Sequence, residues 1–339
     1  QRNLCLAGGL LCPFRAEHLI QKENVMQQHQ IRNTLLLVLG ALIWGVAFVA
    51  QAVGSGYVGA YTFLACRSWL ACVFLAGLIL VRRRLARRFQ ARPAASAVPD
   101  RRKALLGGIL CGVFLFAASA AQQMAVGTVS TAKASFLTAL YIVLVPLAGF
   151  FTGNRPGWRI WLCIGVSVAG LYLLCMAGQD TLSLLGGEWQ LLLAALLFAV
   201  QILLVGRYSP HADGVELSFF QFATVSVLST LFTFVFERPS WQLIAGAAGA
   251  ILYCGILSSG IGYTLQIIGQ RGLDPTIASL AMCLESVFGA LSGWLMLGQK
   301  LTLTELTGCV LMFAAIVGTT VAERPSRKTG RKDTSETAE

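Results

Sequence analysis

Charged side chains are scarce in this sequence. Asp, Glu, Lys and Arg make up 12% of its 339 residues, while hydrophobic residues make up 56%. Soluble domains carry roughly a quarter charged residues, so this composition excludes an ordinary soluble domain. It predicts an all-α polytopic membrane protein. The net charge of +11 does not indicate a nucleic-acid partner, because the positive residues lie in one loop and the tails, where they favour membrane lipid.

Histidine is also rare, and its positions exclude a metal site inside the membrane. His18, His29 and His211 all lie outside the apolar runs, so the imidazole ligands of such a site are missing. The chain has ten cysteines without a Cys-x-x-Cys pair, and eight of them lie within apolar runs, where we interpret them as small buried side chains. No metal or other cofactor is expected. The runs also lack paired acidic motifs and a Gly-x-Gly-Asp motif, which argues against a membrane enzyme.

Ten apolar runs predict ten transmembrane helices, because each is close to the ~20 residues that a helix needs to cross a bilayer. They form two halves of five, 35–177 and 188–321, flanked by an N-terminal segment, 1–34, and a charged tail, 322–339. The connections are short apart from loop 82–103, which carries nine Lys and Arg residues. The predicted spans are 35–53, 61–81, 104–124, 129–151, 159–177, 188–206, 217–236, 244–268, 276–297 and 302–321.

The two halves contain the same element twice. The run from Gly127 to Gly153 recurs at an offset of 145 residues as the run from Gly272 to Gly298. Because five spans is an odd number, the second half is expected to enter the membrane upside down relative to the first. An inverted repeat of this kind is typical of transporters, whose substrate site lies between the halves.

The distribution of Lys and Arg predicts the orientation of the chain. With the N-terminus inside, 22 of the 26 Lys and Arg residues fall on the inner side, whereas the outer loops hold only Arg238 and Lys300. The positive-inside rule therefore places both termini in the cytoplasm. Met26 is the first methionine that directly precedes a span, so we expect the natural chain to begin there, with residues 1–25 as upstream sequence.

Three charged residues lie more than three residues from either end of a predicted span, where a charge costs at least ~2.5–3.5 kcal/mol and is therefore a candidate for function. Glu285 lies near the middle of the ninth span, on a face of small residues that includes Ala281 and Gly289. Its carboxyl group is a candidate proton carrier, because a medium of low dielectric constant favours the neutral form. The alternative is a structural carboxyl that fixes helix packing.

The other two charges are Lys133, near the outer end of the fourth span, and Arg67, in the second. Lys133 either attracts a carboxylate-bearing substrate or extends its stem to the membrane surface. Arg67 either pairs with Glu285, binds substrate or anchors the outer interface. Tyr141 lies two turns deeper than Lys133 and is expected to serve the same cavity, and Pro146 is expected to kink this span.

Polar uncharged residues gather on one face of the third and eighth spans, which are related by the repeat. Such faces predict a water-filled central path rather than contact with lipid, although hydrogen bonds between helices are the simpler alternative. A tryptophan and two further glutamines on the first and sixth spans fit the same lining. The candidate lining residues are Trp44, Gln51, Gln122, Gln123, Gln201, Tyr263 and Gln266.

At this level of detail the sequence resembles the EamA-type drug/metabolite transporter superfamily over essentially all of 35–321. The resemblance is carried by LGALIWGVAFVAQ in the first span, FLTALYIVLVPLAGFFTGNRPG in the fourth and ASLAMCLESVFGALSGWLMLGQKLTLTELTGCVLM in the ninth and tenth. The chain departs from the family at Gln299, where a glutamate is usual, and at the corresponding Asn154. The resemblance implies a secondary transporter in a bacterial inner membrane that moves a small molecule without ATP hydrolysis.

Within that class, an amino-acid exporter and a multidrug exporter both remain open, since no residue separates them. A different class is a non-transporting scaffold or signalling protein that uses the basic loop 82–103 to dock anionic lipid or a partner. The charges at Glu285, Lys133 and Arg67 argue against an inert scaffold.

Overall fold

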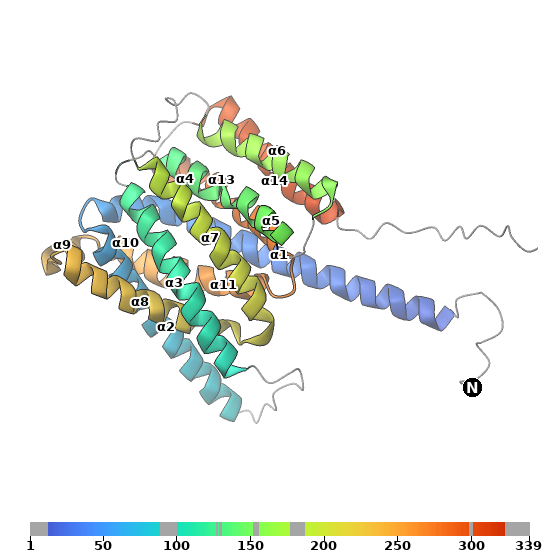
Figure 1. Ribbon diagram of the computed structural model, residues 1–339, viewed down its shortest axis with the longest axis horizontal. Helices are drawn as coiled ribbons and strands as arrows, with labels where there is room; N and C mark the ends of the chain where they lie inside the picture. Colours follow the sequence, from blue (N-terminus) through green and yellow to red (C-terminus); the bar gives the residue numbers. More distant parts are fainter. Residues whose placement is uncertain are drawn as a thin grey trace, which may run out of the picture.

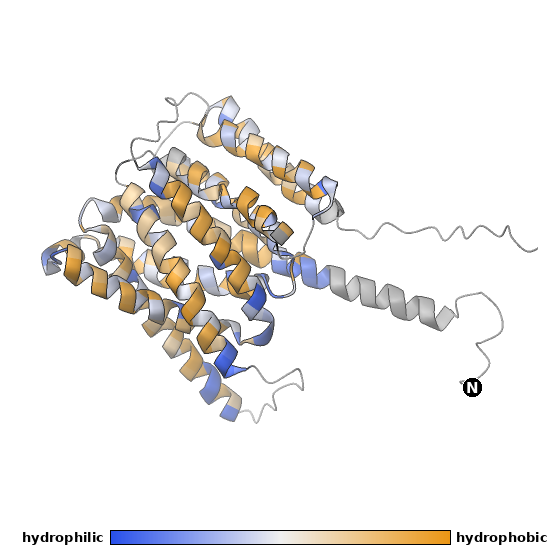
Figure 2. Ribbon diagram, viewed as in Figure 1, coloured by the Kyte–Doolittle hydropathy of each residue, from blue (hydrophilic) through white to orange (hydrophobic). Residues whose placement is uncertain are grey.

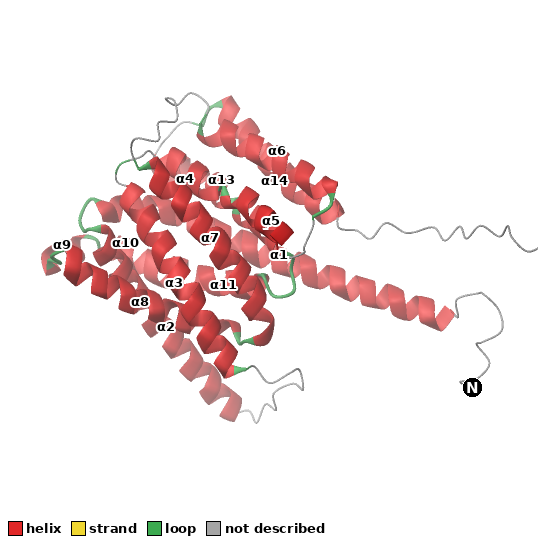
Figure 3. Ribbon diagram, in the orientation of Figure 1, coloured by secondary structure: helices red, strands yellow, loops and turns green. Residues whose placement is uncertain are grey.

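The computed structural model describes residues 13–88, 100–126, 128, 131–151, 156–176, 187–297 and 301–322. The side chains of 13–27, 131–133, 151, 297 and 320–322 lie outside this description, as do residues 89–99 of loop 82–103. Every regular element in the described part is a helix, and the helices follow one another through short connections (Figure 3). The expected all-α class is therefore confirmed for these residues.

The first half contains six of the helices and the second half the remainder (Figure 1). Those of the first half are α1 (Pro13–Ser55), α2 (Ala60–Arg88), α3 (Arg101–Val126), α4 (Thr131–Ala139), α5 (Tyr141–Phe151) and α6 (Trp158–Cys175). The second half begins with α7 (Glu188–Tyr208), the 3₁₀ turn η1 (Ser209–His211), α8 (Gly214–Phe236), α9 (Trp241–Gly246) and α10 (Ala248–Leu252). It continues with the π-helix η2 (Tyr253–Gly262), α11 (Tyr263–Gly269), α12 (Pro275–Met282), α13 (Glu285–Leu297) and α14 (Leu303–Ala322).

Among the described residues, eight helical segments are long and apolar enough to cross a membrane, which makes this a multi-pass membrane protein. Two further apolar segments, Ala134–Phe150 and Leu303–Thr319, are shorter and correspond to the expected fourth and tenth spans. Hydrophobic residues run along the helices, and hydrophilic residues gather mainly at helix ends and in loops (Figure 2). Exposed apolar side chains such as Phe234 and Val73 fit a surface that lies in lipid.

The most extensive helix packing joins the two halves to each other. Helix α2 packs along α8, α6 packs along α14 (Figure 1), and α3 packs against both α7 and α8. Contacts between the halves have counterparts. The contact of α3 with α7 corresponds to the contact of α1 with η2 and α11. The contact of α1 with α13 corresponds to the contact of α7 with α4 and α5. The interfaces therefore exchange when the halves are exchanged, as expected of two repeats related by a two-fold axis.

Glycines bring two of these helix pairs into backbone contact. A Cβ atom built on Gly45 of α1 would lie 2.6 Å from the backbone nitrogen of Gly289 in α13. A Cβ atom on Gly308 of α14 would lie 2.5 Å from the carbonyl oxygen of Gly170 in α6. In membranes, where lipid is as apolar as the side chains, such close packing is a main source of helix association. The small face around Gly289, predicted to serve either packing or a cavity, serves packing at this position.

The helices of the fourth and ninth predicted spans are both interrupted. The fourth divides into α4 and α5 at Leu140, and the ninth divides into α12 and α13 between Met282 and Glu285. At both places a backbone amide donates to the carbonyl oxygen three residues earlier, as in a 3₁₀ turn, and not four residues earlier, as in an α-helix. The amide of Leu140 donates to Leu137 over 3.4 Å, and the amide of Ser286 donates to Cys283 over 3.2 Å. The interruption therefore precedes Pro146, which lies inside α5.

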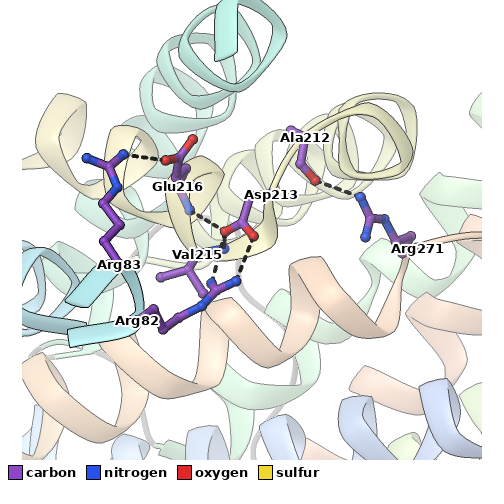
Figure 4. A network of polar contacts seen from close by, with 7 residues as sticks. All are labelled: Arg82, Arg83, Ala212, Asp213, Val215, Glu216 and Arg271. Atoms are coloured by element: carbon purple, nitrogen blue, oxygen red, sulfur yellow. Dashed lines mark hydrogen bonds and ion pairs between the residues drawn. The ribbon is translucent and has the colours of Figure 1, made fainter. Parts of the chain in front are cut away.

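At one end of the α2–α8 pair, charged side chains hold the helices together (Figure 4). Arg82 of α2 makes an ion pair of 3.0 Å with Asp213, and Arg83 makes one of 2.7 Å with Glu216. Asp213 also caps α8 by accepting hydrogen bonds from the backbone amides of Val215 and Glu216. Burial acts to raise the pKa of Asp213, but the hydrogen bonds and the charge of Arg82 outweigh it and hold this pKa below its usual value.

The same end of the bundle gathers further elements around the turn η1. Arg271, between α11 and α12, donates to the carbonyl oxygens of Ser209 (3.0 Å) and Ala212 (2.8 Å). At the opposite end of α2, the carboxylate of Glu237 accepts hydrogen bonds from the backbone amides of Tyr61 (2.9 Å) and Thr62 (2.8 Å). The α2–α8 pair is thus tied at both of its ends.

Candidate functional site

A cavity lies between the two halves, with an empty volume of about 530 Å³ including its open side. Nine of the residues predicted from the sequence line it: Trp44, Gln51, Arg67, Gln122, Tyr141, Gln201, Tyr263, Gln266 and Glu285. The remaining lining residues are Ala47, Phe48, Thr138, Phe198, Ile202, Ser258 and Met282.

The two interrupted spans meet at this cavity. Tyr141 is the first residue of α5 and Glu285 the first residue of α13, so each follows an interruption directly. The hydroxyl group of Tyr141 donates to Oε1 of Glu285 over 3.2 Å, and the hydroxyl groups of Ser135 and Ser286 lie 2.7 Å apart. Glu285 is 7% exposed. The helix interruptions therefore place a carboxylate and a phenol from opposite halves at the same point.

Arg67 is the cation of the cavity, and it is 5% exposed. Its Nη1 atom donates to Oε1 of Gln51 over 3.4 Å, a long hydrogen bond. Its Nε atom has no hydrogen-bond partner among the described residues. Arg67 and Glu285 both line the cavity, but the described part of the chain contains no ion pair between them. The expected alternative in which these two charges pair is not seen.

Glutamine side chains form a chain of hydrogen bonds on the other side of the cavity. Gln266 donates to Gln201 over 3.2 Å, and Gln201 donates to Gln221 over the same distance. Gln122 of α3 donates to the hydroxyl group of Thr138 over 3.3 Å. Gln221, which is fully buried on α8, was missed by the sequence analysis. A single glutamine inside an apolar run was the available signal.

Aromatic side chains provide the apolar part of the lining. The rings of Trp44 and Tyr263 lie 4.8 Å apart between centroids, and the indole N–H of Trp44 donates to the carbonyl oxygen of Ser258 over 3.3 Å. Ser258 lies in η2, whose π-helical geometry was not predicted. Gly262 at the end of η2 admits the indole, because a Cβ atom there would lie 2.8 Å from its nitrogen. Single π-helical segments are rare and often mark functional sites.

Two predicted residues are not among the lining. Gln123 is buried beside the cavity and donates to the backbone carbonyl of Gln51 over 3.5 Å. Lys133 lies in the first turn of α4, and its side chain falls outside the described residues. Within the described ranges, no group of three His, Cys, Asp or Glu side chains is placed to hold a metal ion.

A helical membrane bundle with two repeated halves around a buried polar cavity has the architecture of a membrane transporter. The sequence pattern of the EamA-like transporter family matches residues 32–176 and 185–321, which together make up most of the chain. The chain therefore belongs to the EamA-like transporter family, as the resemblance predicted. Its family consists of transporters rather than enzymes, and the two matched stretches fit a two-repeat layout.

Individual proteins with similar sequences are also transporters where their role is named. The chain is 24% identical over 294 residues to the uncharacterized transporter YoaV of Bacillus subtilis, covering 84% of this chain and 96% of that one. It is 30% identical over 192 residues to the threonine/homoserine exporter RhtA of Escherichia coli, covering 54% and 61%. A solved crystal structure at 19% identity has the same fold, with a TM-score of 0.68 over 86% of this chain and 97% of the other.

Proposed function

We propose that this protein is a secondary active exporter of small metabolites or drugs that exchanges its substrate for protons through Glu285. The observation that carries the proposal is the position of Glu285: a carboxyl group 7% exposed, lining a cavity between the two halves, and hydrogen-bonded by Tyr141. A carboxyl group retained inside a membrane protein is a marker of proton or substrate pathways. The transporter family of the chain supports the same function.

The proposed exchange uses one site for two ligands in turn. The carboxyl group of Glu285 either holds a proton or, as a carboxylate, attracts a positive group of the substrate. It does not do both at once, so binding of such a substrate releases the proton and binding of a proton releases the substrate. Tyr141 donates a hydrogen bond to the carboxylate form and orients it within the cavity.

Alternating access requires that the cavity open to the two sides of the membrane in turn. We propose ten spans in the bacterial inner membrane, with both termini and the Arg82 end of the bundle in the cytoplasm, in accordance with the charge distribution. The contacts of Arg82 with Asp213 and of Arg271 with Ala212 (Figure 4) then close the cytoplasmic end in this conformation. Opening to the cytoplasm requires that some of them break.

The test is proton movement in proteoliposomes. The purified protein is reconstituted with a pH-sensitive dye inside the vesicles, and amino acids and cationic drugs are added one at a time. We expect at least one solute to move protons, and Glu285→Gln to abolish this movement. Glu305→Gln is the matched control, because Glu305 lies in the first turn of α14, outside the cavity. If Glu285→Gln folds and still moves protons with substrate, the proposed coupling is wrong.

The substrate range in that panel includes both classes left open by the sequence. RhtA exports threonine and homoserine, which makes amino acids the first solutes to test. Cationic drugs form the second group, because a cation binds favourably over an aromatic ring and Trp44 and Tyr263 both line the cavity.

A further inference from the structure

Arg67 and Gln221 occupy the same position in the two repeats. Arg67 is seven residues after Ala60, where α2 begins, and Gln221 is seven residues after Gly214, where α8 begins. Since α2 and α8 are the second helices of their halves and pack along each other, the two residues are related by exchange of the halves.

Each of the two residues also contacts a glutamine of the preceding long helix. Arg67 donates to Gln51 of α1, and Gln221 accepts from Gln201 of α7. The two glutamines lie about one helical turn apart in the repeat, because 16 residues separate Gln51 from Arg67 and 20 separate Gln201 from Gln221. At the position that Arg67 and Gln221 share, the first half carries a guanidinium group where the second half carries a neutral amide.

The positive charge of Arg67 has no ion-pair partner among the described residues. An arginine is always protonated in proteins, and a buried charge that is neither paired nor fully hydrogen-bonded is costly. Arg67 is only 5% exposed, and its Nε atom has no hydrogen-bond partner within the described residues. Its hydrogen bond to Gln51 is long, at 3.4 Å. The only carboxylate among the cavity residues, that of Glu285, does not pair with it.

We infer that Arg67, assisted by Gln51, is the binding site for the carboxylate of the transported substrate. The planar guanidinium group presents N–H donors in a fork that matches a carboxylate. The cavity then offers a cation at Arg67 and an anion at Glu285, which is the charge pattern of a zwitterion. The substrate class is a small amino acid or a related molecule that carries both an acidic and a basic group.

This inference rests on the proposed function, since it assigns the ligand of the same cavity. It also decides between the two substrate classes: a cationic drug without a carboxylate leaves Arg67 uncompensated, whereas an amino acid compensates both charges. The lining glutamines and the Trp44–Tyr263 pair remain available for the side chain of the substrate.

The experiment compares each of the twenty amino acids with its amide, which keeps the ammonium group and loses the carboxylate. Binding to the purified protein is measured by thermal stabilisation, and transport by competition for uptake into proteoliposomes. For at least one amino acid, the wild type is expected to prefer the acid over the amide by roughly 10- to 100-fold, the value of a hydrogen bond to a charged group.

Arg67→Gln, which reproduces the residue already present in the second half, is expected to abolish this preference. Arg84→Gln removes the same charge from the exposed end of the same helix and is expected to keep it. If Arg67→Gln does not fold, Arg67→Lys takes its place, and it is expected to lower the preference because an ammonium group lacks the fork.

The outcomes separate this inference from the proposed function. The carboxylate site is overturned if the wild type shows no preference for acids over amides. It is also overturned if this preference persists in Arg67→Gln or is unchanged in a folded Arg67→Lys. If acids bind in preference to amides and Arg67→Gln removes this preference, but no solute crosses the membrane, the site stands and the transport proposal is wrong. If solutes cross without any preference, transport stands and the carboxylate site is wrong.

Discussion

The contact between Gly45 and Gly289 leads to a prediction in which two similar substitutions have different effects. A Cβ atom on Gly45 would lie 2.6 Å from both the nitrogen of Gly289 and Cβ of Phe288, whereas ordinary contact begins at 3.4 Å. A Cβ atom on Gly289 would lie 3.6 Å from the oxygen of Gly45, which is ordinary contact. A methyl group therefore lacks room at Gly45 but fits at Gly289.

Gly45→Ala forces α1 and α13 apart by several tenths of an ångström, because the atoms in the way belong mainly to the backbone of α13 and cannot rotate aside. Overpacking of this kind costs about 1–3 kcal/mol in the free energy of unfolding. Gly289→Ala places its Cβ atom at ordinary contact distance, 3.6 Å from the oxygen of Gly45, so its cost is expected to stay close to zero. Since Trp44 and Glu285 adjoin this contact, Gly45→Ala is also expected to reduce transport.

The assay is thermal unfolding of the purified protein in detergent, followed by intrinsic fluorescence. A change of 1 kcal/mol shifts Tm by roughly 2–4 °C in chains of 150–250 residues, so Gly45→Ala should unfold several degrees below Gly289→Ala. If the two variants unfold at the same temperature, the helices are not in backbone contact at Gly45 and the proposed packing of α1 on α13 is wrong.

Two further predictions concern the ties at the ends of the α2–α8 pair. Asp213→Ala removes the cap of α8 and the ion pair with Arg82, which is expected to cost about 0.5–2 kcal/mol at neutral pH. Because the pKa of Asp213 is lowered on folding, the stabilising effect is present above the usual value of 3.8 and is lost as the pH falls through the lower value in the folded protein. Unfolding of both proteins as a function of pH checks this, and an advantage of the wild type that grows as the pH falls would contradict it. Glu237→Ala removes the acceptor for the first amides of α2 and is expected to cost about 1 kcal/mol, whereas Arg238→Ala, which removes the neighbouring charge, serves as the control in the same melt.

Hydropathy was sufficient to locate the helices, because a backbone in lipid must satisfy its own hydrogen bonds and an apolar run has no alternative to a helix. It could not predict the interruptions at Leu140 and at Cys283–Leu284. At each interruption a backbone amide donates to the carbonyl three residues earlier, and hydropathy does not distinguish this bond from the bond to the fourth residue in an α-helix. The proline expected to mark the bend, Pro146, lies inside α5.

The cavity lining could be predicted in large part, because a polar side chain in an apolar run has few places to go except the space between helices. Trp44, Gln51 and Gln266 were selected on this ground and all line the cavity. Gln221 was not selected, and its role became visible only through its hydrogen bond to Gln201.

The packing between halves has a consequence for the synthesis of the chain. Helices α2, α3 and α6 find their main partners in α8, α7 and α14, all of which are translated later. The first half therefore enters the membrane before the surfaces that it packs against exist, and Gly170 of α6 faces lipid until Gly308 of α14 arrives. Insertion and packing are separated in time, and the final apolar helix completes the fold. Any event that ends translation before residue 188 leaves a membrane-inserted first half whose interfaces with α7, α8 and α14 are all open at once, whereas an end before residue 303 leaves the α14-facing surface of α6 open.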